Sequence, residues 1–488
     1  MFNELFSQAI EKSGWSQNYI SKTFNINRGL IYKYMHGELL IPKATFLRLL
    51  EEMKITRTER DIIFEQYYRE AYGDEKFKIL KYLENTFNGL DEFCKPVKGF
   101  ANKSLNFDIT DLAVKDFMHL NSENDILGCV DYILKTAVPG EIITNYPYTA
   151  KKFDDMLFNN MIPDSNFSVL HMLTFDKGSD TINNLNNIFS SIRWLQYGIN
   201  PVYCYENNKA VKFSPYPYYF AVDSYCVLFS TGSAKGIFIK SDPVFADLKK
   251  ASDMFKKQSL SLAIFPRDIF EFKNEMQKAV INTIESNWSM YPCLSAVADE
   301  KFITSIIRTE VPGIEMLAKM AIQHYEHGLK VANERYIVSA LGLRMFAETG
   351  KIHEVPSAFV HEAPPAQRIR FLKKLIELSE LDRLMILDDS SFLFPEVLCM
   401  DLFENVVQIS GMFENIDDKM KHNGNFIINI DNKSLRQDFE QFKNYICESK
   451  YFYSKHTTKS YIDSLIILCE NLYDNTDRKL FLNTAYCK

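Results

Sequence analysis

The sequence predicts a multidomain protein in which an all-α N-terminal domain precedes a larger α/β region. At 488 residues the chain exceeds what one hydrophobic core usually organises. Apolar side chains recur at helical spacing over residues 1–72, and beyond residue 121 strand-like and helical patterns alternate. A content of 46% hydrophobic and 14% aromatic residues is typical of a folded protein.

Two segments of the N-terminal domain show apolar residues three and four positions apart, which places them on one helical face. They are Leu5, Phe6, Ala9 and Ile10 in the first helix, and Phe46, Leu49, Leu50 and Met53 in the fourth. Each stripe predicts a helix that packs against its neighbours.

Two short helices are predicted between them from their start signals. Ser16 is a preferred N-cap, and Trp15 before it can pack against Ile20, so a helix begins there and runs to about Phe24. The same pattern repeats at Asn27, after a turn of about three residues. Two helices joined so tightly must cross steeply, which predicts a helix-turn-helix.

Residues 16–37 resemble the Cro/CI-type (XRE) helix-turn-helix family, and the likeness extends over roughly the first 70 residues. It is carried by Ser16, Gln17, Ile20, Phe24, Ile26, Asn27, Ile31, Tyr34, Gly37 and Pro42. The resemblance implies that Gln17 contacts a DNA phosphate and that Asn27 lies near one. It also implies that an exposed face of the third helix, formed by Arg28, Gly29, Tyr32 and Lys33, meets base edges in double-stranded DNA.

The chemistry of that face suits DNA, although two positions depart from the family pattern. Arg28 can pair with guanine through two hydrogen bonds, Lys33 can reach acceptors or phosphate, and Tyr32 can pack on a thymine methyl group. Gly29 has no side chain where a polar group is common, and Met35 stands where an acidic residue is frequent.

The local charge also favours DNA. Between residues 12 and 48 only Glu38 is acidic, in a chain of net charge −7. The basic residues there are Lys12, Lys22, Arg28, Lys33, Lys43 and Arg48. A basic segment in an acidic protein indicates a surface for nucleic acid, and Lys43 joins the predicted DNA contacts. The alternative is a small helical domain whose solvated charges serve protein contacts.

The remaining chain shows two stretches in which helices alternate with strands, the pattern of an α/β layer domain. In the first, helices are predicted over 124–137, 183–198 and 242–257, and strands over 141–146, 167–175, 201–206, 218–223, 225–230 and 236–241. In the second, helices are predicted over 367–380 and 431–446, and strands over 383–388, 397–403, 405–410 and 425–430.

Five parts of the chain follow from these patterns. They are a helix-turn-helix domain over 1–72, a helical linker over 73–120, a first α/β lobe over 121–260, a helical connector over 261–330, and a second α/β lobe with a C-terminal helix over 331–488. Residues 236–255 parallel 425–445, since each is an apolar strand followed by an Asp and a helix. Either the two lobes are repeats, or both segments simply follow the usual construction of α/β units.

By the order of its elements, the two-lobed region resembles a phospholipase D-like arrangement, in which paired α/β lobes face each other across a cleft. The catalytic pattern of that family has His and Lys two apart, and none of the nine His residues here has Lys at the second following position. The resemblance therefore implies an inactive fold. A similar degenerate lobe is the small-molecule sensor of TrmB-type regulators, which also carry a DNA-binding domain.

Other chemical sites are not predicted. His324 and His327 lie three apart on a helix but lack a third ligand, so we expect no metal. Asp388 and Asp389 follow a strand, where Asp usually forms a turn. The nine cysteines form no CxxC pair and are expected to be core thiols. We expect no catalytic residues and no cofactor.

No apolar run approaches the ~18 residues needed to span a bilayer, and the first residues lack the pattern of a signal peptide. We therefore expect no membrane association and a bacterial cytoplasmic protein that joins the nucleoid when it binds DNA.

Two functions are compatible with these patterns. The favoured one is a transcriptional regulator, for example a repressor, whose N-terminal domain reads an operator while the C-terminal region forms a homodimer and senses a small-molecule or peptide effector. The alternative is an effector or enzyme with an α/β catalytic region that the N-terminal domain brings to DNA or to a partner.

Overall fold

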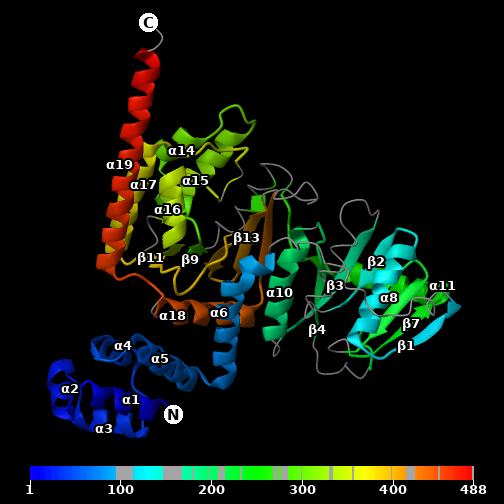
Figure 1. Cartoon of the computed structure of the whole chain (residues 1–488), viewed down its shortest axis with the longest axis horizontal. Helices are drawn as coiled ribbons and strands as arrows, with labels where there is room; N and C mark the ends of the chain where they lie inside the picture. The colour runs from blue at the N-terminus through cyan, green and yellow to red at the C-terminus, as the bar shows by residue number, and fades with distance from the viewer. Residues whose placement is uncertain are drawn as a thin grey trace.

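The protein is multidomain, with an all-α N-terminal domain followed by two mixed sheets and their helices, as the sequence predicts (Figure 1). The structure is a computed structural model. It describes residues 1–94, 114–146, 167–177, 181–196, 198–206, 215–230, 234–266, 271, 274–275, 284–297, 299–328, 334–353, 355, 357–396, 398–413, 424–448 and 451–485.

The N-terminal domain packs its helices around a core that is rich in aromatic side chains. The helices are α1 (Phe2–Lys12), α2 (Gln17–Phe24), α3 (Arg28–His36), α4 (Lys43–Glu52) and α5 (Arg57–Tyr72). Seven of the eight apolar residues predicted to line α1 and α4 are buried, and Leu5 is partly buried against them. Phe46 stacks on Tyr67 with ring centroids 4.0 Å apart, which holds α5 against α4.

The first lobe is built on an eight-stranded sheet in the order β1-β7-β6-β5-β2-β3-β4-β8. Its strands are β1 (Phe117–Leu120), β2 (Glu141–Thr144), β3 (Ser168–Asp176), β4 (Val202–Glu206), β5 (Tyr218–Val222), β6 (Tyr225–Phe229), β7 (Gly236–Lys240) and β8 (Leu260–Ser261). Its helices are α8 (Glu123–Thr136), α10 (Thr181–Gln196) and α11 (Asp242–Gln258). Each element predicted for this lobe is present.

The second lobe is built on a six-stranded sheet in the order β11-β10-β9-β12-β13-β14. Its strands are β9 (Ile284–Ser289), β10 (Arg335–Ser339), β11 (Leu384–Leu387), β12 (Leu398–Phe403), β13 (Val407–Phe413) and β14 (Gly424–Ile430). Its helices are α13 (Leu294–Val297), α14 (Glu300–Ile306), α15 (Ile314–Gly328), α16 (Ala340–Thr349), α17 (Pro365–Glu380), α18 (Lys433–Cys447) and α19 (Lys455–Ala485).

The boundary of the second lobe differs from the sequence expectation. β9 pairs with β10 and β12 at the centre of the sheet, yet it comes from the segment 261–330 that we expected to be a helical connector. β1 likewise comes from the expected linker 73–120 and pairs with β7. Both lobes therefore begin earlier in the chain than the hydrophobic pattern indicated.

The two lobes share one topology. The order β7-β6-β5-β2-β3-β4 matches β14-β13-β12-β9-β10-β11, with three parallel strands at one side and three antiparallel strands at the other. The paired segments noted in the sequence become β7 with α11 and β14 with α18. This equivalence favours the repeat. An antiparallel bridge between Ile264 and Ile427 joins the edges of the two sheets.

The helix α6 (Asp74–Cys94) links the N-terminal domain to both lobes (Figure 1). It packs against α5 on one side, against α10 of the first lobe, and against α18 of the second. Phe87 lies at this junction with 1% of its surface exposed. Its ring centroid is 5.2 Å from that of Phe189, 5.3 Å from Phe394 and 5.5 Å from Phe442.

Replacing Phe87 with Ala is expected to lower the free energy of unfolding by about 3–5 kcal/mol, because the cavity would open where three parts of the chain meet. Urea unfolding followed by circular dichroism measures the change. Phe117→Ala, which removes an exposed ring of β1, serves as a control with an effect within about 0.5 kcal/mol. Equal effects of the two variants would contradict the role of the junction.

His171 of β3 is fully buried in the first lobe. Its Nε2 lies 2.7 Å from the carbonyl oxygen of Tyr146, so the neutral ring donates a hydrogen bond there. Burial lowers the pKa of His171 to about 4. Below its ordinary pKa the unfolded chain therefore takes up a proton that the folded chain does not.

Stability is accordingly expected to fall by about 2 kcal/mol between pH 7 and pH 5, within the window between the ordinary pKa of His and about 4. Urea midpoints at the two pH values measure this loss. A His171→Gln variant should lose that part of the pH dependence, whereas His119→Gln, at an exposed position of β1, should keep it. The same slope in wild type and His171→Gln would refute the assignment.

Candidate nucleic-acid interface

The helix-turn-helix forms where the local signals predict it. Ser16 caps α2 by accepting a hydrogen bond from the Tyr19 amide at 3.1 Å, and Asn27 caps α3 by accepting one from the Gly29 amide at 2.8 Å. Asn25 ends α2 with a φ of 54°, the left-handed conformation that lets the chain turn within three residues. Gly37 ends α3 in the same way.

Apolar contacts hold α3 so that its outer face stays exposed. Ile20 and Phe24 of α2 are buried, as are Ile31 and Tyr34 of α3. Trp15 covers this contact, with its ring 5.4 Å from that of Phe24. The helix lies on the side of the N-terminal domain that faces away from the two lobes (Figure 1).

The structure brings the four predicted α3 residues together on this exposed face. Arg28, Gly29, Tyr32 and Lys33 are all exposed, as is Asn27 beside them. The side-chain oxygen of Asn27 is occupied by the cap, so only its amide group is open to a phosphate. A Cβ at Gly29 would lie 3.2 Å from that oxygen, so a larger residue there requires the Asn27 side chain to shift by a few tenths of an ångström.

Gln17 at the start of α2 and Lys43 at the start of α4 make contacts inside the protein. Gln17 is half-buried, and its Nε2 lies 3.9 Å from the sulfur of Met35. Lys43 begins α4 and forms a 2.7 Å ion pair with Glu448, which follows α18 in the second lobe. Glu448 also accepts a hydrogen bond from Tyr68.

The other basic residues of the N-terminal segment divide into two groups. Lys12 pairs with Glu59 at 2.5 Å, and its hydrogen bond, with those from Thr56, lowers the pKa of Glu59 to about 2. Arg48 donates to the Phe24 carbonyl. Within the part of the chain that the structure describes, no carboxylate pairs with the second group, Lys22, Arg28 and Lys33.

His36 is a member of this surface that the sequence reasoning missed. It is exposed, and its ring stacks on Tyr32 with centroids 3.9 Å apart and an angle of 22° between the planes. Its Nδ1 lies 2.9 Å from the carbonyl oxygen of Tyr32. The spacing of four residues on one helix could have shown this pair. The stacked rings present an aromatic surface beside Lys33.

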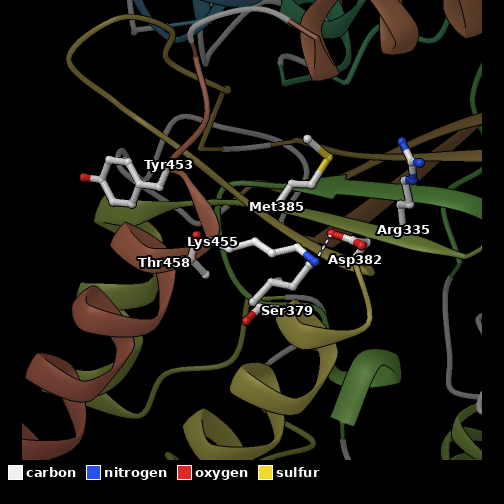
Figure 2. Close-up of a pocket in the computed structure, with 8 residues that line it drawn as sticks. Arg335, Ser379, Asp382, Met385, Tyr453, Lys455 and Thr458 are labelled. Carbon is white, nitrogen blue, oxygen red and sulfur yellow. Dashed lines mark ion pairs between the residues drawn. The ribbon is translucent and has the colours of Figure 1, made fainter. Parts of the chain in front are cut away.

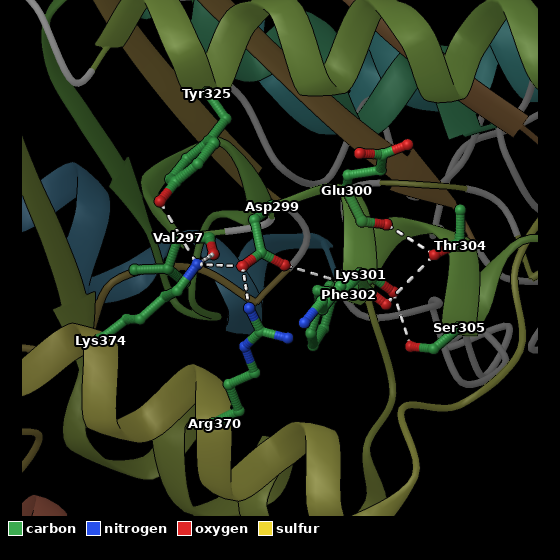
Figure 3. Close-up of polar contacts among 10 residues, drawn as sticks. All are labelled: Val297, Asp299, Glu300, Lys301, Phe302, Thr304, Ser305, Tyr325, Arg370 and Lys374. Atoms are coloured by element: carbon green, nitrogen blue, oxygen red, sulfur yellow. Dashed lines mark hydrogen bonds and ion pairs between the residues drawn. The ribbon is translucent and has the colours of Figure 1, made fainter.

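Two acidic sites elsewhere make contacts within the protein. Asp388 accepts hydrogen bonds from Ser390 in the turn after β11, and Asp389 accepts one from the Leu341 amide at 2.6 Å. Asp299 caps α14 and forms ion pairs with Arg370 and, at 2.6 Å, with Lys374 (Figure 3).

Lys374 of the Asp299 cluster makes two further hydrogen bonds. It donates to the Val297 carbonyl at 3.2 Å and to the Tyr325 hydroxyl at 3.3 Å. This cluster ties α17 to the start of α14. The described residues contain no group of three metal-ligating side chains. The side chains of His324 and His327 lie outside the described residues.

Among the helices that the structure describes, none is both long and apolar enough to cross a membrane.

Comparison with known proteins gives weak structural similarities only. No protein-family model matches the chain. No curated protein matches it either. Among solved structures, TrmBL2, an archaeal chromatin protein with a novel mode of DNA binding, is 12% identical with a TM-score of 0.23, over 50% of this chain and 98% of its own.

Phosphatidylserine synthase of Haemophilus influenzae is 10% identical with a TM-score of 0.26, over 75% of this chain and 94% of its own. Both TM-scores are low, so neither likeness assigns a ligand or an activity to this chain.

Replacing Asn27 with Ala is expected to destabilise the N-terminal domain by about 0.5–2 kcal/mol, because the first turn of α3 loses its cap. Urea unfolding followed by helical circular dichroism measures this change. Asn18→Ala, at an exposed position inside α2, is the matched control and should change stability by less than about 0.5 kcal/mol. No difference between the two would show that the cap does not stabilise α3.

Proposed function

We propose that the protein is a sequence-specific DNA-binding transcriptional regulator. Its N-terminal domain inserts α3 into the major groove, where Arg28 and Lys33 contact bases or phosphates and Tyr32 packs beside them. The observation that carries the proposal is the exposed face of α3, where these two cations lie without a carboxylate partner among the described residues. A cation that no protein group neutralises is available to replace the counterions of DNA.

The arrangement of the domains supports this role. α3 faces away from the lobes, so a duplex can approach it without displacing either sheet (Figure 1). The tight turn at Asn25 and the buried contacts of Ile20 and Ile31 fix the angle between α2 and α3. A rigid pair of helices presents the same side chains to each base pair, which sequence-specific binding requires.

In this proposal the two lobes form a homodimer and sense an effector without catalysing a reaction. One recognition helix contacts only a few base pairs, so two copies would bind half-sites about 34 Å apart. An effector would act by binding more tightly to one arrangement of the N-terminal domains than to another, and its effect could not exceed that difference in affinity. The sequence lacks the paired His and Lys of an active phospholipase D-like site.

The proposal is tested by selecting bound fragments from genomic DNA with the purified full-length protein. Wild type is expected to recover a two-fold symmetric site. The double variant Arg28→Ala, Lys33→Ala should bind that site about 30-fold or more weakly, because each contact contributes about 1–3 kcal/mol. Fluorescence anisotropy at a fixed salt concentration measures the affinities.

The matched control is Lys249→Ala, Lys250→Ala, which removes two exposed cations from α11 of the first lobe. It should retain operator affinity, because it removes the same charge from a surface remote in sequence from α3. Equal loss in both double variants would mean that net charge alone drives binding. Normal affinity in the α3 variant would refute the assignment of α3 as the recognition helix.

A further inference from the structure

A pocket of about 300 Å³ opens in the second lobe, where β10 and β11 begin and α17 ends near the start of α19 (Figure 2). This volume is at the lower end of the range for small-molecule sites. Leu384 and Met385 of β11 also line it, and they point to opposite faces of the strand. The polar lining consists of Arg335, Ser379, Asp382, Tyr453, Lys455 and Thr458.

The charges of the lining leave one cation without an acidic partner. Lys455 and Asp382 form a 2.6 Å ion pair across the pocket (Figure 2). Arg335 contacts the thiol of Cys447, and no carboxylate of the described residues pairs with it. Its neighbour Glu334 is already paired with Arg383 at 3.3 Å. The pocket therefore carries a net positive charge.

The hydroxyl group of Thr458 also lines the pocket. Thr458 lies in the first turn of α19 with 3% of its surface exposed. Its backbone amide donates to Ser454 at 2.8 Å, whereas its hydroxyl has no hydrogen-bond partner among the residues that the structure describes. Because this hydroxyl lines the pocket, it is available to bond to a polar group of a ligand there.

We propose that this pocket binds a small anionic metabolite, with a carboxylate or phosphate group on Arg335, a polar group on Thr458 and an apolar part on Met385. That this pocket is the effector site rests on the regulatory function proposed above. Arginine suits both anions, because its guanidinium group offers two parallel donors.

The pocket is connected to the N-terminal domain through its own walls. The amide of Tyr453, which lines the pocket, donates to the Ile386 carbonyl at 2.9 Å. The segment 451–453 therefore runs along β11. Tyr451 in that segment donates a hydrogen bond to Glu84 of α6. At the far end of β11, Arg57 of α5 lies 4.0 Å from Asp388. A ligand that shifts either wall therefore acts on contacts that hold the N-terminal domain.

The test is calorimetric titration of the full-length protein with inorganic phosphate and, separately, with citrate, each against sodium chloride at the same ionic strength. At least one anion is expected to bind. Arg335→Gln should weaken that binding by about 10- to 100-fold, and Thr458→Val by about 2- to 10-fold. The two titrations distinguish a phosphate ligand from a carboxylate ligand.

The control variant is Arg344→Gln, since Arg344 is an exposed cation of the same lobe that pairs with Glu348 outside the pocket. It should bind the anion as wild type does. Absence of binding by both anions, or equal loss in Arg335→Gln and Arg344→Gln, would overturn the site.

Operator affinity measured with and without the bound anion tests the effector role. A change in wild type that is absent in Arg335→Gln supports it, and unchanged affinity despite anion binding overturns it. Failure of the protein to bind any operator would refute the regulatory function and leave the calorimetric result standing.

Discussion

The arrangement of the domains depends on the apolar contact that α6 makes where the two lobes meet. Phe87 touches aromatic rings from both lobes, so one side chain joins three parts of the chain. Apolar contact is non-directional, and the polar groups around it fix the orientation. Glu84, one turn before Phe87, accepts hydrogen bonds from Tyr445 and Tyr451 and pairs with Lys81.

Farther from this junction, Phe64 and Tyr68 of α5 pack on Tyr445 of α18, and the remaining contacts are polar and partly exposed. Lys43 with Glu448, and Arg57 with Asp388, hold the helix-turn-helix domain to the second lobe. Exposed or half-exposed ion pairs are weak and exchange readily with solvent or other charges. The domain is thus anchored by the apolar contacts of α6 and α5, and the ion pairs at its periphery add little.

Local chemistry made much of the fold predictable. The caps at Ser16 and Asn27 and the apolar stripes depend on residues close to them in the sequence. The helix-turn-helix and most strands could therefore be predicted from the sequence pattern. β9 was missed because Ser286, Asn287 and Ser289 are polar yet buried. They are tolerated because partners on another strand satisfy them, as when Asn287 donates to Asp401 of β12 at 2.6 Å. The ion pair between Lys43 and Glu448 could not be predicted from the sequence either, because Glu448 comes near Lys43 only after the lobes fold.

The short segments that flank the repeated strands limit how two copies can associate. β1 covers the edge of β7, β8 covers that of β4, Ile264 bridges to β14, and residues 451–453 run along β11. An uncovered edge strand invites a neighbouring chain to extend the sheet, which leads to aggregation. The outermost strands of the first sheet, β1 with 4 residues and β8 with 2, are short, which disfavours strand exchange between molecules. The homodimer proposed above would then form through helical surfaces, where side chains rather than backbone groups choose the partner.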